Sequence, residues 1–171
     1  MTTDNDGSLT HTDSDGSARM VDVAPKAITD RVAVASGFVE MSTHTLDLCR
    51  TNALAKGDVI SVARLAGIQG AKYTPLLIPL CHGLNIDHVD IDCQLSQDPP
   101  GIRIRSTARC QGKTGVEMEA MTAVSVAALA IYDMVKGVDR EARIRSIELL
   151  EKRGGKTGHW RRKVVSTDGK E

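Results

Sequence analysis

The chain has 171 residues, of which 41% are hydrophobic and 26% charged, a composition typical of an ordinary globular protein. Its 22 basic and 22 acidic side chains cancel, so no overall field recruits nucleic acid or an anionic membrane, and any anion site must be local. Only 2% of the residues are aromatic, too few for a base-stacking platform, and the apolar runs fall far short of the roughly 20 residues that a membrane span needs.

The two ends of the chain differ in composition from its middle. Residues 1–18 contain four Asp, no Lys or Arg, and no apolar stretch of the kind that a signal peptide requires. We therefore expect a disordered lead over 1–18 and a cytoplasmic protein. Residues 19–160 carry the hydrophobic patterning and predict a single catalytic domain, and 161–171 form a polar tail.

Apolar periodicity predicts the elements of the first half. Alternation predicts a strand over 31–41 with an irregularity at Gly37, followed by Ser42 as a helix cap. Helical spacing over 43–54 and 58–71 predicts two helices, the second with Val59, Val62, Ala63, Ala66 and Leu65 on its apolar side. Pro75 and Pro79 are expected to end this helical stretch.

The second half predicts a hairpin, a long helix and a last strand. Strands over 89–95 and 102–108 flank Pro99-Pro100-Gly101, helix 116–136 lies between Gly115 and Gly137, and 144–151 alternates again. The order strand, helices, strand, strand, helix, strand is that of an α+β ferredoxin-like split βαβ sandwich, with an antiparallel sheet and helices on one face. That topology hosts many functions and decides none of them.

Two short segments are similar to the end of a phosphate-binding loop. Gly112-Lys113-Thr114 and Gly155-Lys156-Thr157 match it, but the upstream glycine of a P-loop would fall on Thr107 and Leu150. Each segment is therefore either a local anion nest or an ordinary turn.

The remaining polar candidates have both a structural and a functional interpretation. His82, beside Cys81 in the turn 78–83, is more often a structural group than a catalytic one. Asp133 and Lys136 share one helix face and would ordinarily form a surface ion pair. Because the helix around them is small and apolar, we predict instead a partly desolvated pair, with a raised Asp pKa and a lowered Lys pKa.

Cysteines and histidines give no metal motif. The four cysteines lack C-x-x-C spacing, which argues against zinc and thioredoxin-type sites and favours free thiols. No histidine has a second ligand at helical or hairpin spacing. The cysteines are Cys49, Cys81, Cys93 and Cys110.

Several motifs in the right order resemble one family. They are Met20-Val-Asp-Val-Ala, Lys56-Gly-Asp-Val, Ala66-Gly-Ile-x-x-Ala-Lys72, Leu77-Ile-Pro-Leu-Cys-His82, and Gly112-Lys-Thr-Gly-Val-Glu-Met-Glu-Ala-Met continuing to Tyr132-Asp-Met-x-Lys136. Together they resemble the MoaC family, the cyclic pyranopterin monophosphate synthases of molybdenum cofactor biosynthesis.

The resemblance implies a reaction and an assembly. A radical-SAM GTP cyclase would supply 3′,8-cyclo-7,8-dihydroguanosine 5′-triphosphate, which is converted to cyclic pyranopterin monophosphate and diphosphate, a phosphorus–oxygen lyase reaction. It also implies a homo-hexamer, a trimer of dimers with active sites across a subunit interface, and no essential metal or other cofactor.

Carried over by position, the resemblance implies three catalytic residues, Asp133, Lys136 and Lys56. The substrate-binding residues that it implies are Leu80, Cys81, His82, Met118, Glu119, Lys72, Glu117, Lys152 and Lys156. A triphosphate needs several cations, and the rearrangement needs positioned proton donors and acceptors.

The chain departs from the family pattern at three places, with Tyr73 for Arg, Gly83 for Pro and Gly70 for Ala. These changes bear on rate and affinity more than on the chemistry. Two other readings stay open: a non-catalytic paralogue that binds a nucleotide or pterin, and an unrelated ferredoxin-like module for RNA or metal. Protection by a guanosine triphosphate analogue or by an oligonucleotide would separate them.

Overall fold

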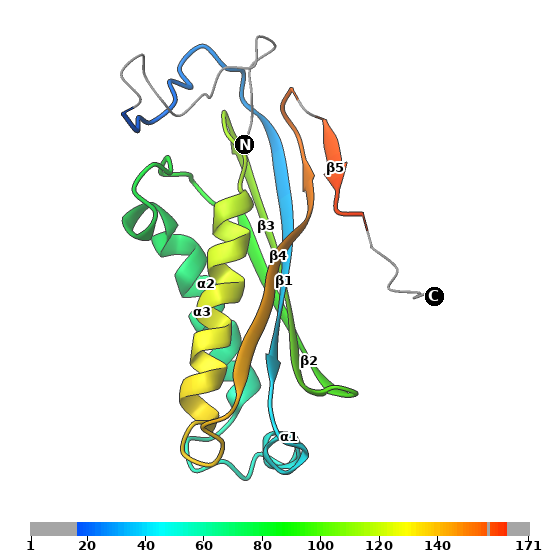
Figure 1. Ribbon diagram of the computed structural model, residues 1–171. Helices are drawn as coiled ribbons and strands as arrows, with labels where there is room; N and C mark the ends of the chain where they lie inside the picture. The colour runs from blue at the N-terminus through cyan, green and yellow to red at the C-terminus, as the bar shows by residue number, and fades with distance from the viewer. Residues whose placement is uncertain (1–16, 157, 164–171) are drawn as a thin grey trace.

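The computed structural model describes residues 17–156 and 158–163, and most of the predicted lead and tail lies outside them. The described chain forms one antiparallel sheet with helices on one face (Figure 1). Its elements are β1 (Thr29–Glu40), α1 (Thr43–Arg50), α2 (Val59–Leu77), β2 (His88–Gln97), β3 (Pro100–Gly112), α3 (Glu117–Val135), β4 (Arg143–Arg153) and β5 (His159–Arg161).

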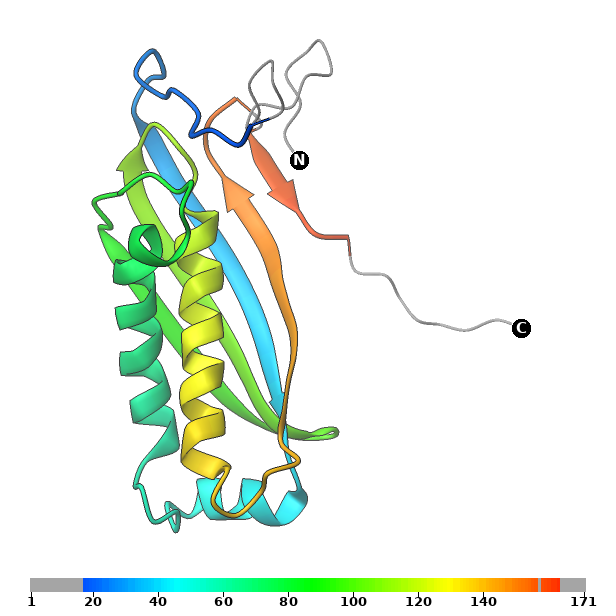
Figure 2. The same ribbon diagram turned by 60° about the vertical axis from the view of Figure 1, so that its left-hand side comes forward.

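The sheet has the strand order β2-β3-β1-β4-β5. β1 lies in the centre of the sheet and pairs antiparallel with both β3 and β4, so strands from the first and second halves of the chain alternate in the sheet. α2 and α3 lie side by side along one face, and α1 lies across the end where β1 leaves the sheet (Figure 2). This arrangement confirms the predicted α+β ferredoxin-like fold.

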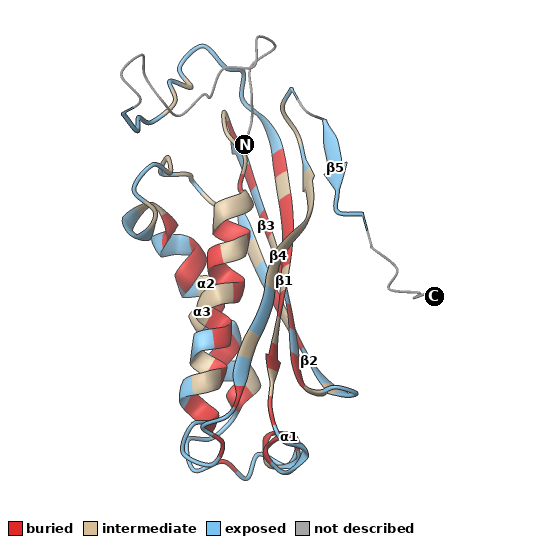
Figure 3. Ribbon diagram, viewed as in Figure 1, coloured by how far each residue is buried: buried red, intermediate tan, exposed pale blue. Residues whose placement is uncertain are grey.

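The core lies between the sheet and the helices, where the buried residues in Figure 3 face one another. Small side chains let α3 approach the strands closely. The hydroxyl of Ser106 on β3 donates to the carbonyl oxygen of Ala120 at 2.7 Å. A Cβ on Gly37 would lie 2.6 Å from Cγ1 of Val124. The register of β1 against β4 shifts between Ser36 and Phe38, so the predicted irregularity at Gly37 is confirmed.

The two early helices begin where predicted but end elsewhere. Ser42 caps α1, accepting from the Thr45 N–H at 3.2 Å. α1 stops at Arg50 rather than at 54, because Asn52 takes a left-handed φ of 53°. Pro75 does not end α2, which runs to Leu77: within the last turn the proline costs one backbone hydrogen bond, and the Ile78 N–H still reaches the Thr74 carbonyl at 2.9 Å.

The buried face of α2 differs from the predicted one. Val59 and Ala63 are fully buried as expected, but Val62 is 39% exposed and Leu65 is 69% exposed. The buried face continues through Gly67 and Gly70, at the spacing of the seam that α2 forms with α3. Because glycine has no side chain to contribute to a hydrophobic pattern, the sequence does not predict this seam.

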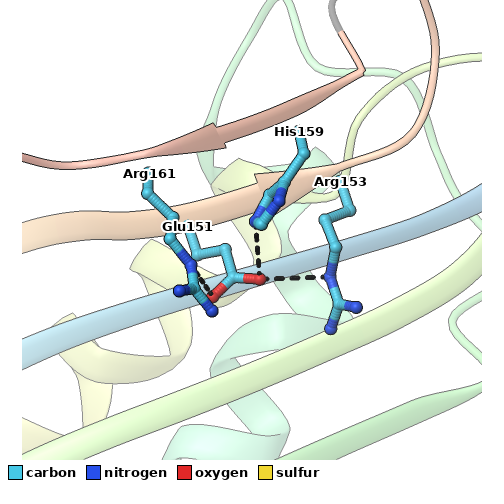
Figure 4. Close-up of polar contacts among 4 residues, drawn as sticks. All are labelled: Glu151, Arg153, His159 and Arg161. Atoms are coloured by element: carbon cyan, nitrogen blue, oxygen red, sulfur yellow. Dashed lines mark hydrogen bonds and ion pairs between the residues drawn. The ribbon is translucent and has the colours of Figure 1, made fainter.

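The strand β5 was not predicted, because a stretch of three polar and aromatic residues carries no periodicity. It pairs antiparallel with β4, and the carboxylate of Glu151 on β4 contacts side chains of both strands (Figure 4). Glu151 lies 3.1 Å from Nε of Arg153, 3.0 Å from Nε2 of His159 and 3.1 Å from Nε of Arg161. Residues 159–161 therefore belong to the sheet.

Candidate active site

Three predicted catalytic residues meet at the C-terminal end of α3. Asp133 lies in the last turn of α3, Lys136 caps that helix, and Lys56 comes from the loop between α1 and α2. Nζ of Lys136 lies 2.7 Å from Oδ1 of Asp133, and Nζ of Lys56 lies 2.6 Å from Oδ2. Lys56 also donates to the Asp133 carbonyl oxygen at 2.7 Å. We call these residues the lysine–aspartate cluster.

The electrostatics of this cluster are opposite to the sequence prediction. Hydrogen bonds donated by Lys136 and Lys56 hold the pKa of Asp133 at about 2, and the bond that Lys136 donates to Asp133 raises the pKa of Lys136. The desolvated pair that we predicted is wrong for the single chain. The side chains of Lys56, Asp133 and Lys136 are 47%, 55% and 52% exposed, so charge pairing outweighs desolvation.

A second group of predicted residues lies at the other end of α3. Nζ of Lys152 on β4 lies 2.8 Å from Oε1 of Glu117, with both side chains about three-quarters buried. Glu119, two residues further along α3, is 2% exposed. Burial raises the pKa of Glu119, and the Glu117 carboxylate raises it further.

The turn after α2 lies near the same, N-terminal end of α3. The Cys81 N–H donates to the Ile78 carbonyl at 3.1 Å. Burial raises the pKa of Cys81, and the negative charge of Glu119 adds to the effect, so the thiol lies within the field of the start of α3. His82 is half-buried and Leu80 is exposed in the same turn. We call residues 80–82, Glu117, Glu119 and Lys152 the helix-start cluster.

The other predicted binding residues lie at the edges of this cluster. Met118 is half-buried in the first turn of α3, and Lys156 is exposed in the turn between β4 and β5. Lys72 is exposed on α2, where it lines a shallow cavity of about 360 Å³ together with residues 84–89. A larger cavity of about 520 Å³ lies on the open face of the sheet, lined by Ser36 and Arg103 among others, and none of the predicted site residues lines it.

The two clusters are far apart in one chain. Glu117 and Asp133 lie near opposite ends of α3, which at about 1.5 Å per residue separates them by about 24 Å (Figure 1). The resemblance implied that Lys56, His82 and Lys152 act on one substrate, but a single copy of the chain does not bring Lys56 near the other two.

Sequence reasoning missed Arg31. This residue starts the inward-facing row of β1 that continues with Ala33 and Ala35, and it is only 9% exposed. Its Nε donates to the carbonyl oxygen of Gly112 at 3.1 Å. An arginine on the apolar side of an alternating strand was the available signal, because such a position normally takes a hydrophobic residue.

The described residues hold no group of three or more His, Cys, Asp or Glu side chains arranged to bind a metal ion. The four cysteines are free thiols. Within the described part of the chain, α3 is the one helix long and apolar enough to cross a membrane, and 56% of that apolar stretch is buried in the core, as in the central helix of many globular domains.

Comparison with known proteins extends these observations. The model of the MoaC family matches residues 20–155. Curated proteins named cyclic pyranopterin monophosphate synthase are similar along almost their whole length. The one from Chloroflexus aurantiacus is 56% identical over 156 residues, which is 90% of this chain and 94% of that protein. The one from Dinoroseobacter shibae is 55% identical over 89% of this chain and 96% of its own length. The one from Brucella ovis is 54% identical, with 90% and 93% covered. The sequence motifs, the sheet order and these matches agree, and the chain belongs to the MoaC family.

Proposed function

We propose that this chain is a cyclic pyranopterin monophosphate synthase of molybdenum cofactor biosynthesis, a lyase. Its substrate would be 3′,8-cyclo-7,8-dihydroguanosine 5′-triphosphate and its products cyclic pyranopterin monophosphate and diphosphate. The observation that carries the proposal is the pairing of Lys56 and Lys136 with the two carboxylate oxygens of Asp133. The names of relatives that are 54–56% identical over about nine-tenths of the chain support it.

The lysine–aspartate cluster suits proton transfer in the ring rearrangement. In the single chain the pKa near 2 makes Asp133 a weak base and the raised pKa makes Lys136 a weak acid. The pair therefore positions a proton acceptor and a proton donor, and substrate or a second copy of the chain would have to displace part of this pairing before they react. Because each lysine holds one carboxylate oxygen, the proton donor and acceptor stay in a fixed relation to one another. We assign both residues to the rearrangement and Lys56 to holding Asp133 and the phosphates.

The helix-start cluster suits the phosphate step. A ribose-derived hydroxyl oxygen would bond to the α-phosphorus and pass its proton to a base, while the bond from that phosphorus to the bridging oxygen breaks and diphosphate leaves with the electron pair. His82, Lys152 and Lys156 would bind the phosphate oxygens, and Glu117 orients Lys152 through their 2.8 Å contact. Leu80, Cys81, Met118, Glu119 and Lys72 would surround the rest of the substrate.

A site that uses both clusters requires two copies of the chain. The length of α3 separates the clusters by about 24 Å, more than a single nucleotide-sized substrate bridges. We propose that the lysine–aspartate cluster of one copy completes the helix-start cluster of another, within a homo-hexamer built as a trimer of dimers. The wider proposal is a cytoplasmic enzyme without a metal cofactor that receives its substrate from a radical-SAM GTP cyclase.

The reaction is tested in a coupled assay in which that cyclase generates the substrate. Wild-type protein should form the cyclic pyranopterin and diphosphate, and folded Asp133→Asn and Lys136→Ala proteins should not. No product from an assembled wild type would favour the non-catalytic paralogue, and Tyr73→Arg and Gly83→Pro would then be the reversions to assay.

The shared site is tested by mixing inactive variants. Asp133→Asn and Lys152→Ala each disable one cluster, so each variant alone should be inactive. Mixed oligomers would contain some interfaces with both clusters intact and should regain part of the activity. If mixed oligomers form and stay inactive, the two-copy site is wrong, whatever the reaction proves to be.

A further inference from the structure

Asp139 is a buried carboxylate that joins two distant parts of the chain. It lies in the loop after α3, close to Lys136, with 9% of its surface exposed. Its Oδ2 accepts the Ser42 N–H at 2.8 Å and the Thr45 hydroxyl at 3.0 Å, both at the start of α1. Its Oδ1 accepts the Glu141 N–H at 3.1 Å. One side chain thus fastens the start of α1 to the loop after α3, which lies beside it (Figure 2).

The surroundings of Asp139 keep it ionised. Burial works to raise the pKa of its carboxyl group, but the hydrogen bonds donated by Ser42, Thr45 and Glu141 outweigh burial and lower the pKa. The unpaired N–H groups at the start of α1 also favour a negative charge there. Hydrogen bonds to an ionised acceptor are stronger than bonds between neutral groups, so this link between α1 and the loop is a firm one.

The backbone of Asp139 is tied to the end of α3. Its N–H donates to the Val135 carbonyl oxygen at 2.9 Å, and the Lys136 N–H donates to the Tyr132 carbonyl oxygen at 2.9 Å. Both bonds continue the last turn of α3, which also carries Asp133. The side chain that reaches α1 therefore extends from the same hydrogen-bonded turns that present Asp133 and Lys136.

On the other side of the link, α1 is tied to Lys56 by consecutive short-range hydrogen bonds. The Ala53 N–H reaches the Leu48 carbonyl at 2.9 Å, which closes the end of α1. The Gly57 N–H then reaches the Leu54 carbonyl at 3.0 Å, and Leu54 is 7% exposed, so this turn is anchored in the core. Lys56 lies inside that turn, and its backbone follows the position of α1.

Two sets of hydrogen bonds join 41–58 to 130–142 among the residues that the structure describes: those of Asp139 to the start of α1, and those of Lys56 to Asp133. The side chains of Lys56 and Asp133 are 47% and 55% exposed, and so exposed an ion pair contributes little to fixing the segments that carry it. We propose that Asp139 is a positioning residue that holds Lys56 on Asp133. It acts through the backbone of both segments, and its consequence for catalysis rests on the proposed function.

The test is the titration of Asp133 in the full-length protein, followed by carbon-13 NMR of labelled aspartate. Asp139→Ala removes every acceptor of the link, so Lys56 should leave Asp133. The Asp133 pKa should then rise above about 2 to the value found in Lys56→Ala, and stay below 3.8 because Lys136 is still bonded. The direction is diagnostic, since the loss of a nearby negative charge alone would lower this pKa. In the coupled assay kcat should fall about 100-fold, the effect of misplacing a catalytic group by about 1 Å.

Two further variants separate the link from a general loosening of α1. Ser42→Ala removes the side-chain cap of α1 but leaves the backbone N–H that Asp139 accepts, so the Asp133 pKa and kcat should stay at their wild-type values. Asp139→Asn keeps one oxygen that can accept from α1 and should restore part of both values lost in Asp139→Ala. The proposal is overturned if Asp133 still titrates near 2 in a folded Asp139→Ala protein, or if Ser42→Ala raises its pKa equally.

Thr45→Val covers the case in which Asp139→Ala does not fold. It keeps the size of the side chain and removes one bond to Oδ2 of Asp139, so Asp133 should titrate between its wild-type value and that of Lys56→Ala. An unmoved midpoint would overturn the proposal. The titration requires no turnover, so a raised Asp133 pKa in the variants without product formation by the wild type would retain the positioning role and reject the synthase.

Discussion

The ammonium of Lys56 lies 2.6 Å from the carboxylate of Asp133, a residue 77 positions further along the chain. The contact joins the loop after α1 to the end of α3, two segments with no local reason to meet. It forms because α2 runs antiparallel to α3 along the sheet, which returns the start of α2 to the end of α3 (Figure 2). The antiparallel packing of two helices thus assembles the lysine–aspartate cluster.

Removing the charge of Asp133 should abolish catalysis without unfolding the protein. For Asp133→Asn and for Lys136→Ala we expect kcat to fall by about 10²- to 10⁴-fold, the usual contribution of a positioned acid or base. The measurement is product formation in the coupled assay, with melting temperature as the check on folding. Asp47→Asn is the control, because Asp47 and Arg50 form an equally exposed ion pair on α1. A similar loss for Asp47→Asn would contradict a specific role for Asp133.

The carboxyl group of Asp133 should titrate near pH 2. Its folded pKa lies below the ordinary value of 3.8, so the stability it contributes is present above that ordinary value and is lost as pH falls through about 2. Carbon-13 NMR of labelled aspartate should give this midpoint in the wild type. In the Lys56→Ala, Lys136→Ala double variant it should move up toward 3.8, since the two hydrogen bonds that lower the pKa are gone. An unmoved midpoint would mean that the lysines do not set it.

Gly70→Ala should destabilise the fold. The new Cβ would lie 2.8 Å from Cβ of Val126 across the seam between α2 and α3. Overpacking costs about 1–3 kcal/mol, and the gain in helix propensity returns about 1 kcal/mol, so we expect a net loss of about 1 kcal/mol. Urea unfolding measures it. Gly83→Ala is the control, because no atom lies within 4 Å of its Cβ position and its stability should stay near that of the wild type.

Glu151→Gln should release β5 from β4. The cations around Glu151, with Arg161 and His159 foremost, outweigh burial and lower the pKa of this carboxyl group. Its contribution is therefore present above the ordinary value of 4.5 and is lost as pH falls through the lowered pKa. The protection factors of the amides at 159–161, corrected for the intrinsic exchange rate at each pH, should be lower in Glu151→Gln at pH 7, and in the wild type they should fall only under acid conditions. Equal exchange in both proteins at pH 7 would show that backbone pairing alone holds the strand.

Local pattern in the sequence was sufficient for most of the elements. Alternation over 102–108 and the small apolar run before Asp133 have the periods of a strand and a helix, so β3 and α3 were found within a few residues of their ends. β5 was missed because three residues show no period, and the continuation of α2 past Pro75 because a proline in the last turn costs little. The family motifs could also be recognised from the sequence alone, since each is a continuous string of residues.

Only the tertiary structure decided how these residues act on one another. The sequence identified Asp133 and Lys136 but predicted the wrong direction for both pKa values, because a pKa depends on the neighbouring charges and the exposure that packing creates. It named Lys56 and Lys152 together, whereas the length of α3 holds them at opposite ends of the molecule. It passed over Arg31, which the packing buries and joins to the Gly112 carbonyl, 81 residues further along the chain. The sequence by itself determined most of the elements, their order and the family, since these follow from local periodicity and continuous motifs. Distances, exposure and charge pairing join residues remote in the chain, and therefore only the packed structure fixed them.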